Sequence, residues 1–150
     1  MDEEASWKKL EDEIGPFRMV RKKDAAYRQI LMAAKCVLEG EWECAITLAG
    51  AAEGQIEDVE GIVTLFSRTK NLPSRANFNS EREHVAFVNG VRDWLKHSSD
   101  QKDKLICERE AILMVGRALS KYWNAHHDNL ETIKEFAEWS KLRGFTSVTI

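Results

Sequence analysis

A fixed cation and a titratable imidazole stand close together in the segment 92–97, which reads RDWLKH. An arginine can hold a phosphoryl group through parallel hydrogen bonds. A histidine near neutral pH can take a proton from one oxygen and return it to another. Arg92 and His97 together therefore suit the cleavage of a phosphodiester without a metal ion. A chain with ten arginines and four histidines contains roughly one such pair by chance, so the surrounding elements have to support the interpretation.

The chain around this segment is expected to be helical. Apolar residues recur at intervals of three and four along nearly its whole length, which is typical of amphipathic helices. We expect an all-α fold, an antiparallel bundle of about five to six helices, in a single domain covering 1–150. The expected helices cover about 3–13, 24–39, 42–66, 80–97, 104–123 and a last segment from 128 to before Gly144, followed by a tail at 145–150.

Glycine, proline and capping residues mark the helix ends. The first helix stops at Gly15 and Pro16 and is expected at the periphery of the bundle. Asp24 can cap the second helix, and Gly40 can end it. The third helix is interrupted by glycines that would allow close contact with a neighbouring helix, namely Gly50, Gly54 and Gly61.

The RDWLKH segment lies at the end of the helix expected at 80–97. Ser80 and Glu83 form a capping box at its start, after the main loop at 69–79. The buried face of this helix is expected to carry Val85, Val88, Val91 and Leu95.

The next helix, at about 104–123, is expected to be the core helix. One of its faces carries the apolar residues Leu105, Ile112, Val115, Leu119 and Trp123.

The spacing of the pair decides which contacts one helix allows. Arg92 and His97 are five residues apart and point about 140° away from each other on an ideal helix. Asp93 and His97 are four apart and share a face, which predicts that Asp93 orients the imidazole. Two copies of this helix meeting at a twofold axis would bring Arg92 of one chain to His97 of the other. The sequence thus favours a homodimer.

Three further residues of this helix are candidates for contact with a substrate or with a second copy. Gly90 occupies a mid-helix position where alanine would be more stable, which fits close approach. Trp94 lies between the pair and can line the same cleft, and Lys96 adds a positive charge. The remaining tryptophans fit core and interface packing better than base stacking; they are Trp7, Trp42, Trp123 and Trp139.

Charge and hydropathy exclude several classes of protein. The net charge of −3 and the pI near 5.9 argue against broad wrapping of DNA or RNA, which requires a strongly basic surface. The longest apolar run, at 111–115, is too short to span a bilayer, and the first residues do not read as a signal peptide. A cytoplasmic protein without a membrane anchor is expected.

Other groupings of reactive residues favour structural roles, and no metal or cofactor is expected. Glu81 and His84 match one half of a di-metal motif that has no second half. The acidic cluster Glu53, Glu57, Asp58 and Glu60 lacks a matching acidic motif on a later helix and is interpreted as a charged helix face.

The remaining histidines and the three cysteines are also expected to have structural roles. His126 and His127 precede Asp128 where a helix should end, and Asp128 with Glu131 resembles a cap for the last helix. The cysteines form no C-x-x-C pair and are expected as reduced thiols in the core, namely Cys36, Cys44 and Cys107.

The helical bundle with Arg92, a polar Asp93 and His97 near the end of one helix resembles the HEPN superfamily, whose signature is an arginine and a histidine four to six residues apart. In active members these residues of two protomers line a cleft and cut RNA without metal. The resemblance implies that Arg92 stabilises the phosphorane-like transition state and that His97 moves a proton. Members modified by a nucleotidyltransferase antitoxin carry a tyrosine where this chain has Ser99, so that regulation does not carry over.

A second resemblance spans about residues 25–142. The segments 45–52, AITLAGAA, and 91–98, VRDWLKHS, look like those of an uncharacterised family of small helical bacterial proteins. This likeness supports the helical architecture.

Two functions follow as hypotheses. The first is a HEPN-like, metal-independent endoribonuclease of a toxin or defence system, acting on RNA as a homodimer and partnered by an antitoxin or another protein. The alternative is a non-catalytic dimeric helical binding protein of unknown ligand, in which Arg92 pairs with Asp93 and His97 is a terminal cation.

Overall fold

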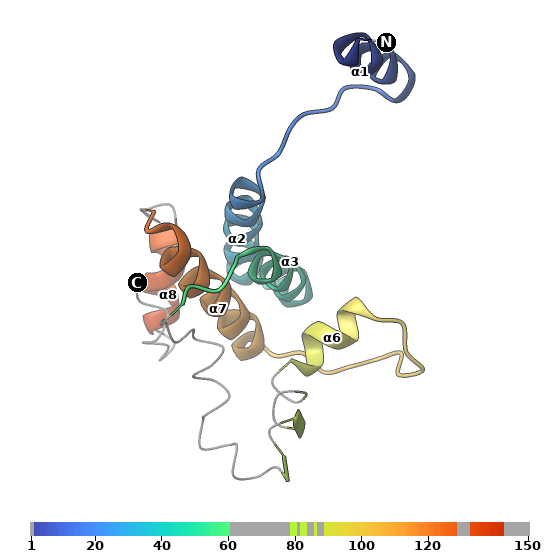
Figure 1. Cartoon of the computed structure of the whole chain (residues 1–150). Helices are drawn as coiled ribbons and strands as arrows, with labels where there is room; N and C mark the ends of the chain where they lie inside the picture. Colours follow the sequence, from blue (N-terminus) through green and yellow to red (C-terminus); the bar gives the residue numbers. More distant parts are fainter. Residues whose placement is uncertain are drawn as a thin grey trace.

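The computed structural model describes residues 2–60, 79–80, 82–83, 86, 89–128 and 133–142, and this part of the chain is all-helical, which confirms the expected fold class. The helices are α1 (Glu3–Ile14), α2 (Lys22–Leu38), α3 (Trp42–Gln55), α6 (Gly90–Lys96), α7 (Glu108–His126) and α8 (Lys134–Leu142) (Figure 1). None of these helices combines the length with the apolar composition that crossing a bilayer requires.

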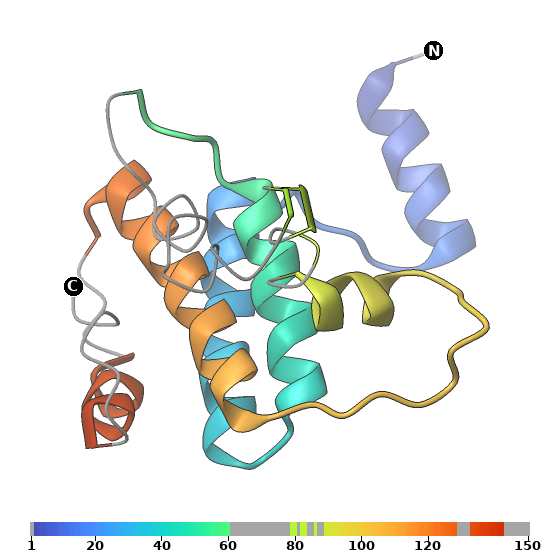
Figure 2. The same cartoon turned by 90° about the horizontal axis from the view of Figure 1, so that it is seen from below.

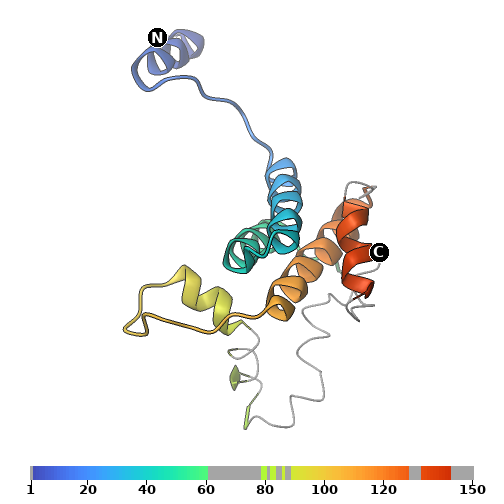
Figure 3. The same cartoon turned by 180° about the vertical axis from the view of Figure 1, so that it is seen from behind.

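The core lies where α2, α3 and α7 pack together (Figure 3). The contact faces of α2 and α3 are rich in alanine, so their backbones can approach closely, and Ile30 and Ile46 fill the remaining space. Each fully buried Ile side chain contributes about 1.5–3 kcal/mol relative to exposure. The buried alanines of the two helices are Ala26, Ala33, Ala34, Ala45, Ala49 and Ala52.

α7 lies in the core, as predicted, but Trp123 of its predicted apolar face is 39% exposed. Ile112, Val115 and Leu119 are buried. The helix begins later than expected, because Cys107 occupies the N-cap and its N–H donates to the Glu110 carboxylate at 2.9 Å. Leu105, expected on the buried face, precedes the helix and is 97% exposed.

α3 ends at Gln55, eleven residues before the predicted end at Phe66. Ile56 is already extended, with φ −94° and ψ 128°, yet its side chain is buried. Gly50 and Gly54 weaken the last turns of the helix, and the extended backbone still brings Ile56 into the core. Residues 57–60 are not helical, and 61–66 lie outside the described residues.

The predicted helix 80–97 is interrupted at Asn89, where φ is −96° and ψ is 1°, and α6 starts at Gly90. Ser80 accepts from the Glu83 N–H at 3.1 Å, and the Glu83 carboxylate accepts from the Asn79 N–H at 3.0 Å, so the predicted cap is present with Asn79 as the second donor. The Asn89 side chain is buried on α7, which holds the chain in a turn there.

The first helix lies apart from the core helices (Figure 1). Figures 1 and 3 show α1 away from the other helices, at the end of the stretch 15–21, and no residue of α1 is buried. At the other end, α8 packs on the core through the buried residues Phe136 and Ser140. Figure 2 shows α8 and α6 at opposite sides of the core helices.

Several smaller predictions were wrong. Asp24 does not cap α2; Arg21 stands at the N-cap, and its hydrogen bond to Asp24, 2.8 Å between Nε and Oδ2, lowers the pKa of that carboxyl. Cys44 and Cys107 are exposed and do not lie in the core, whereas the half-buried Cys36 packs against it. Burial raises the pKa of the Cys36 thiol.

Other predictions fall on residues outside the description. Within the main loop predicted at 69–79, residues 69–78 belong to this group. The others are the half-motif Glu81 and His84, the apolar pair Val85 and Val88, the cap partner Glu131, Gly61 and the tail at 145–150.

Candidate functional site

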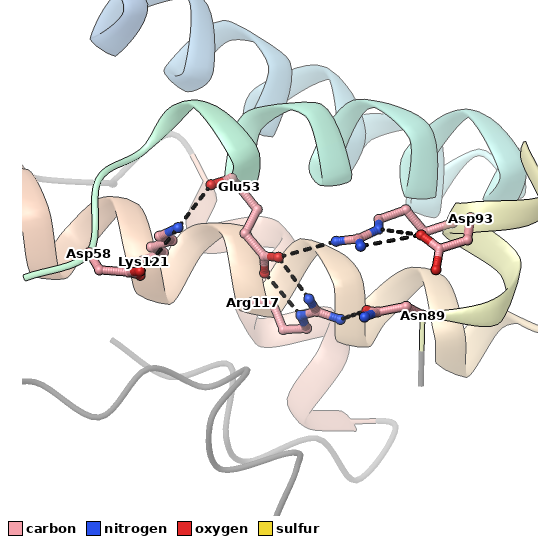
Figure 4. Close-up of polar contacts among 7 residues, drawn as sticks. Glu53, Asp58, Asn89, Asp93, Arg117 and Lys121 are labelled. Carbon is pink, nitrogen blue, oxygen red and sulfur yellow. Dashed lines mark hydrogen bonds and ion pairs between the residues drawn. The ribbon is translucent and has the colours of Figure 1, made fainter. Parts of the chain in front are cut away.

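A buried ion pair joins α3 to α7 beneath the RDWLKH segment. The Glu53 carboxylate accepts from Arg117 Nε at 2.9 Å and from Nη2 at 2.7 Å (Figure 4). Arg117 is 2% exposed and Glu53 8%. Burial lowers the pKa of the Arg117 guanidinium, and the Glu53 charge opposes that shift. The two-point geometry compensates two charges that would each be costly alone in the core.

Asn89 connects this pair to the start of α6. Its Oδ1 accepts from Arg117 Nη1 at 2.9 Å, and its backbone carbonyl accepts from the Asp93 N–H at 2.9 Å, which closes the first turn of the helix. A contact from α7 therefore fixes where α6 begins and in which direction it runs.

Arg92 reaches the same carboxylate from α6. Its Nη1 lies 3.6 Å from Glu53 Oε1, and its Nε and Nη2 both donate to Asp93 Oδ1 at 3.3 Å. The side chain is 29% exposed and lies over Gly50. Two carboxylates thus hold the guanidinium, one buried on α3 and one at the surface of α6.

His97 ends α6. It is the C-cap, with an extended backbone, and its N–H donates to the Asp93 carbonyl at 3.1 Å. Its side chain is exposed, and within the described part of the chain the imidazole has no hydrogen-bond or ion-pair partner. The expectation that Asp93 orients the imidazole is not met in the single chain, because its carboxylate binds Arg92 instead.

Trp94 is half-buried and anchors the connection between α6 and α7. Its Nε1 donates to the Gln101 carbonyl at 2.9 Å, and the Ser99 hydroxyl donates to the same oxygen at 3.1 Å. This contact folds the chain after His97 back toward α6. Trp94 thus positions the loop next to the imidazole.

A groove of about 390 Å³ runs between α3 and α6 beside Arg92. Its residues from α3 are small, its charged residues Arg92 and Lys96 come from α6, and the full set is Thr47, Gly50, Ala51, Gly54, Arg92, Leu95 and Lys96. Of the glycines expected to allow close contact, Gly50 does so toward Arg92, whereas a Cβ at Gly54 would meet nothing within 4 Å. We name this the α3–α6 groove.

Gly90 differs from its predicted setting. It is the first residue of α6, not a mid-helix residue, and a Cβ there would meet nothing within 4 Å in the single chain. The helix-propensity argument for close approach at Gly90 therefore does not hold.

The acidic cluster at 53–60 is not one charged helix face. Glu53 is buried in the ion pair, while Asp58 lies beyond α3 and pairs with Lys121 at 3.3 Å. Lys121 also donates to the Glu53 carbonyl at 3.2 Å. The sequence did contain a signal, since Glu53 is spaced four and three residues from the buried Ala49 and Ile56, a core-facing position.

The sequence patterns did not predict the roles of Arg117 and Asn89 in this site. Arg117 lies on the buried face of α7, where a cation requires a buried carboxylate. In the described part of the chain, Glu41, Glu43 and Cys44 could approach one metal ion, but all three are exposed, and nothing else there indicates one.

The site therefore consists of a guanidinium held by carboxylates, an exposed imidazole at the end of the same short helix, and an adjoining groove with two basic residues. Comparisons of the chain with protein-family models, with curated proteins and with solved structures find no match.

Proposed function

We propose that this protein is a metal-independent endoribonuclease of the toxin or defence type, acting in the cytoplasm as a homodimer. The observation that supports the proposal is how the structure holds Arg92 and exposes His97. The Arg92 guanidinium is held in place by Glu53 and Asp93, and the His97 imidazole is exposed with no described partner. A preorganised cation and an available proton carrier are the two groups that phosphodiester cleavage needs.

The reaction requires one proton to be removed and one to be supplied. The 2′-oxygen of the RNA attacks the neighbouring phosphorus and gives its proton to one His97. The bond to the 5′-oxygen breaks, and that oxygen takes the proton from the same imidazole. The products are a 2′,3′-cyclic phosphate and a free 5′-hydroxyl. Arg92 stabilises the charge that develops on the phosphoryl oxygens.

A second copy supplies what one chain lacks. α6 has seven residues, with Arg92 in its first turn and His97 at its C-cap. Two such helices at a twofold axis would bring Arg92 of each copy next to His97 of the other, which makes two equivalent sites. The overall charge of −3 restricts RNA binding to this local site.

The test is incubation of the purified protein with labelled tRNA and a structured mRNA in EDTA. Cleavage should leave cyclic phosphate ends, and DNA of the same sequence, which lacks the 2′-hydroxyl, should stay intact. His97→Ala and Arg92→Ala should abolish cleavage. His127→Asn is the matched control, because it removes a histidine from the end of α7 and keeps a residue suited to the left-handed backbone there.

Mixing the two inactive variants tests the shared cleft. If Arg92 and His97 of different copies form each site, half of the dimers in an equal mixture carry one intact site, and about a quarter of the wild-type rate returns. If no cleavage activity returns, Arg92 and His97 of the same chain form each site. No cleavage by the wild-type protein, or equal cleavage by all variants, would contradict the proposal.

One observation favours a second function, a non-catalytic dimeric binding protein. Arg92 already has two carboxylate partners, and the Arg92–Asp93 contact is the pairing expected if the arginine is structural. The α3–α6 groove would then be the binding surface. This function predicts intact RNA in the EDTA experiment.

A further inference from the structure

α1 presents an apolar face that, apart from Phe17, no residue of the described part of the chain covers. Trp7 is 50% exposed and Ile14 69%, and Phe17, which contacts the Trp7 ring at a centroid distance of 5.7 Å, is also exposed. An isolated helix of this length is marginal in water, so α1 gains most of its stability from packing on a partner.

This face is also acidic. Trp7, Leu10 and Ile14 have the spacing of one helical face, and Glu4 and Glu11, three before and four after Trp7, flank it. Over its whole length, α1 carries five carboxylates and two lysines. Its partner surface should therefore combine an apolar floor with basic edges.

The α3–α6 groove has these properties. The small residues Ala51 and Gly54 form part of its floor, and the open space above Gly54 leaves room for an aromatic ring. Both charged residues that line it, Arg92 and Lys96, are basic. Lys96 is exposed and has no ion-pair partner among the described residues, so it is available to a carboxylate or to the face of an indole.

We propose that α1 of one copy docks in the α3–α6 groove of a second copy, with Trp7 in the groove and Glu11 near Lys96, and that the exchange is reciprocal. The connection at 15–21 is not helical, its seven residues reach at most about 25 Å, and Gly15, with φ 91°, ends α1. Two arms exchanged about a twofold axis would close the assembly as a dimer.

Arg92 lines both the groove and the proposed cleavage site, but the arm exchange and RNA cleavage are tested by separate measurements. The nuclease proposal places two α6 helices at a shared cleft, whereas the arm proposal concerns only what fills the groove beside α6. A dimer that cuts RNA and keeps its mass without α1 would overturn the arm exchange and leave the nuclease intact.

The experiment measures the mass of the full-length protein by light scattering over a wide range of concentration. We expect two chains for the wild type. Trp7→Ala should raise the dissociation constant of the dimer about tenfold or more, as the loss of an anchoring aromatic does. Gly54→Phe should do the same by filling the groove, and the open space there lets the fold accept the ring. The controls, Trp123→Ala and Gly54→Ala, should keep the wild-type mass.

A charge exchange tests the register of the docked helix. Lys96→Glu should weaken the dimer, and adding Glu11→Lys should restore it. Lys9→Glu, on the opposite face of α1, should change little. A wild type that stays a single chain at every concentration, a dimer that survives either Trp7→Ala or Gly54→Phe, or no restoration by the charge exchange would each overturn the proposal.

Discussion

The side chain of Arg92 lies so close to Gly50 that a Cβ at that position would be 2.9 Å from Arg92 Cδ and 3.1 Å from its Cγ. The middle of the arginine side chain, rather than its mobile end, makes this contact. Glycine at position 50 therefore sets the path along which α6 sends Arg92 toward Glu53.

The first prediction compares two glycines of α3. Gly54→Ala should raise the free energy of unfolding by about 0.5–1 kcal/mol, because alanine is the better helix former and its Cβ meets nothing. Gly50→Ala should gain less or lose stability, because Arg92 must shift. Chemical denaturation of both variants measures the difference, and equal stabilisation would show that Arg92 moves aside without cost.

The second prediction concerns the buried ion pair. Glu53→Ala should lower the free energy of unfolding by about 3–5 kcal/mol, since it leaves the Arg117 charge uncompensated in the core. Glu57→Ala is the control, because Glu57 is the next acidic residue in the sequence and is exposed. This change should lower the free energy of unfolding by less than about 0.5 kcal/mol. Denaturation with urea measures both.

The same pair should be non-additive. Arg117→Met removes the cation that needs Glu53, so the double variant should be more stable than the sum of the two single changes predicts. Additive losses would mean that the two side chains do not depend on each other.

The third prediction is a dependence on pH. The Asp128 carboxylate accepts hydrogen bonds from the Lys23 ammonium and from the Tyr122 hydroxyl. Both lower the pKa of the carboxyl below the usual value of about 3.9, and the bond from Lys23 has the larger effect. The stabilisation by the charged carboxylate is therefore complete above that value and is lost as the pH falls through the lower pKa of the folded state. Asp128→Asn should be less stable than the wild type at neutral pH.

That difference should shrink in strongly acidic solution, and thermal unfolding at a series of pH values measures it. Asp100→Asn is the control, because Asp100 is exposed and has no partner among the described residues. A gap between wild type and Asp128→Asn that stays constant as the pH falls would contradict the prediction.

The fourth prediction concerns the loop after His97. Trp94→Phe removes the 2.9 Å hydrogen bond to the Gln101 carbonyl, a loss of about 1 kcal/mol that should speed amide exchange in this loop about fivefold. Hydrogen exchange with mass spectrometry can follow peptides across 98–106. Trp123→Phe, on an exposed part of α7, should leave these peptides unchanged.

The sequence determined the fold class and the position of the core helices, because apolar periodicity depends on which residues follow one another. It also predicted the cap at Ser80 and the place of α7 in the core. These features rest on local spacing and on glycine and proline chemistry, which act within a few residues.

Only the tertiary structure decided what Glu53, Asn89 and Arg117 do. The three residues come from distant parts of the chain, so no local pattern links them, and Glu53 resembled one member of an exposed acidic run. The contact between Asn89 and Arg117 also fixes the turn at which α6 starts. The free-energy cost of burying a charge is offset only when folding brings a group of opposite charge next to it. Spacing along the sequence does not show which residue that group is.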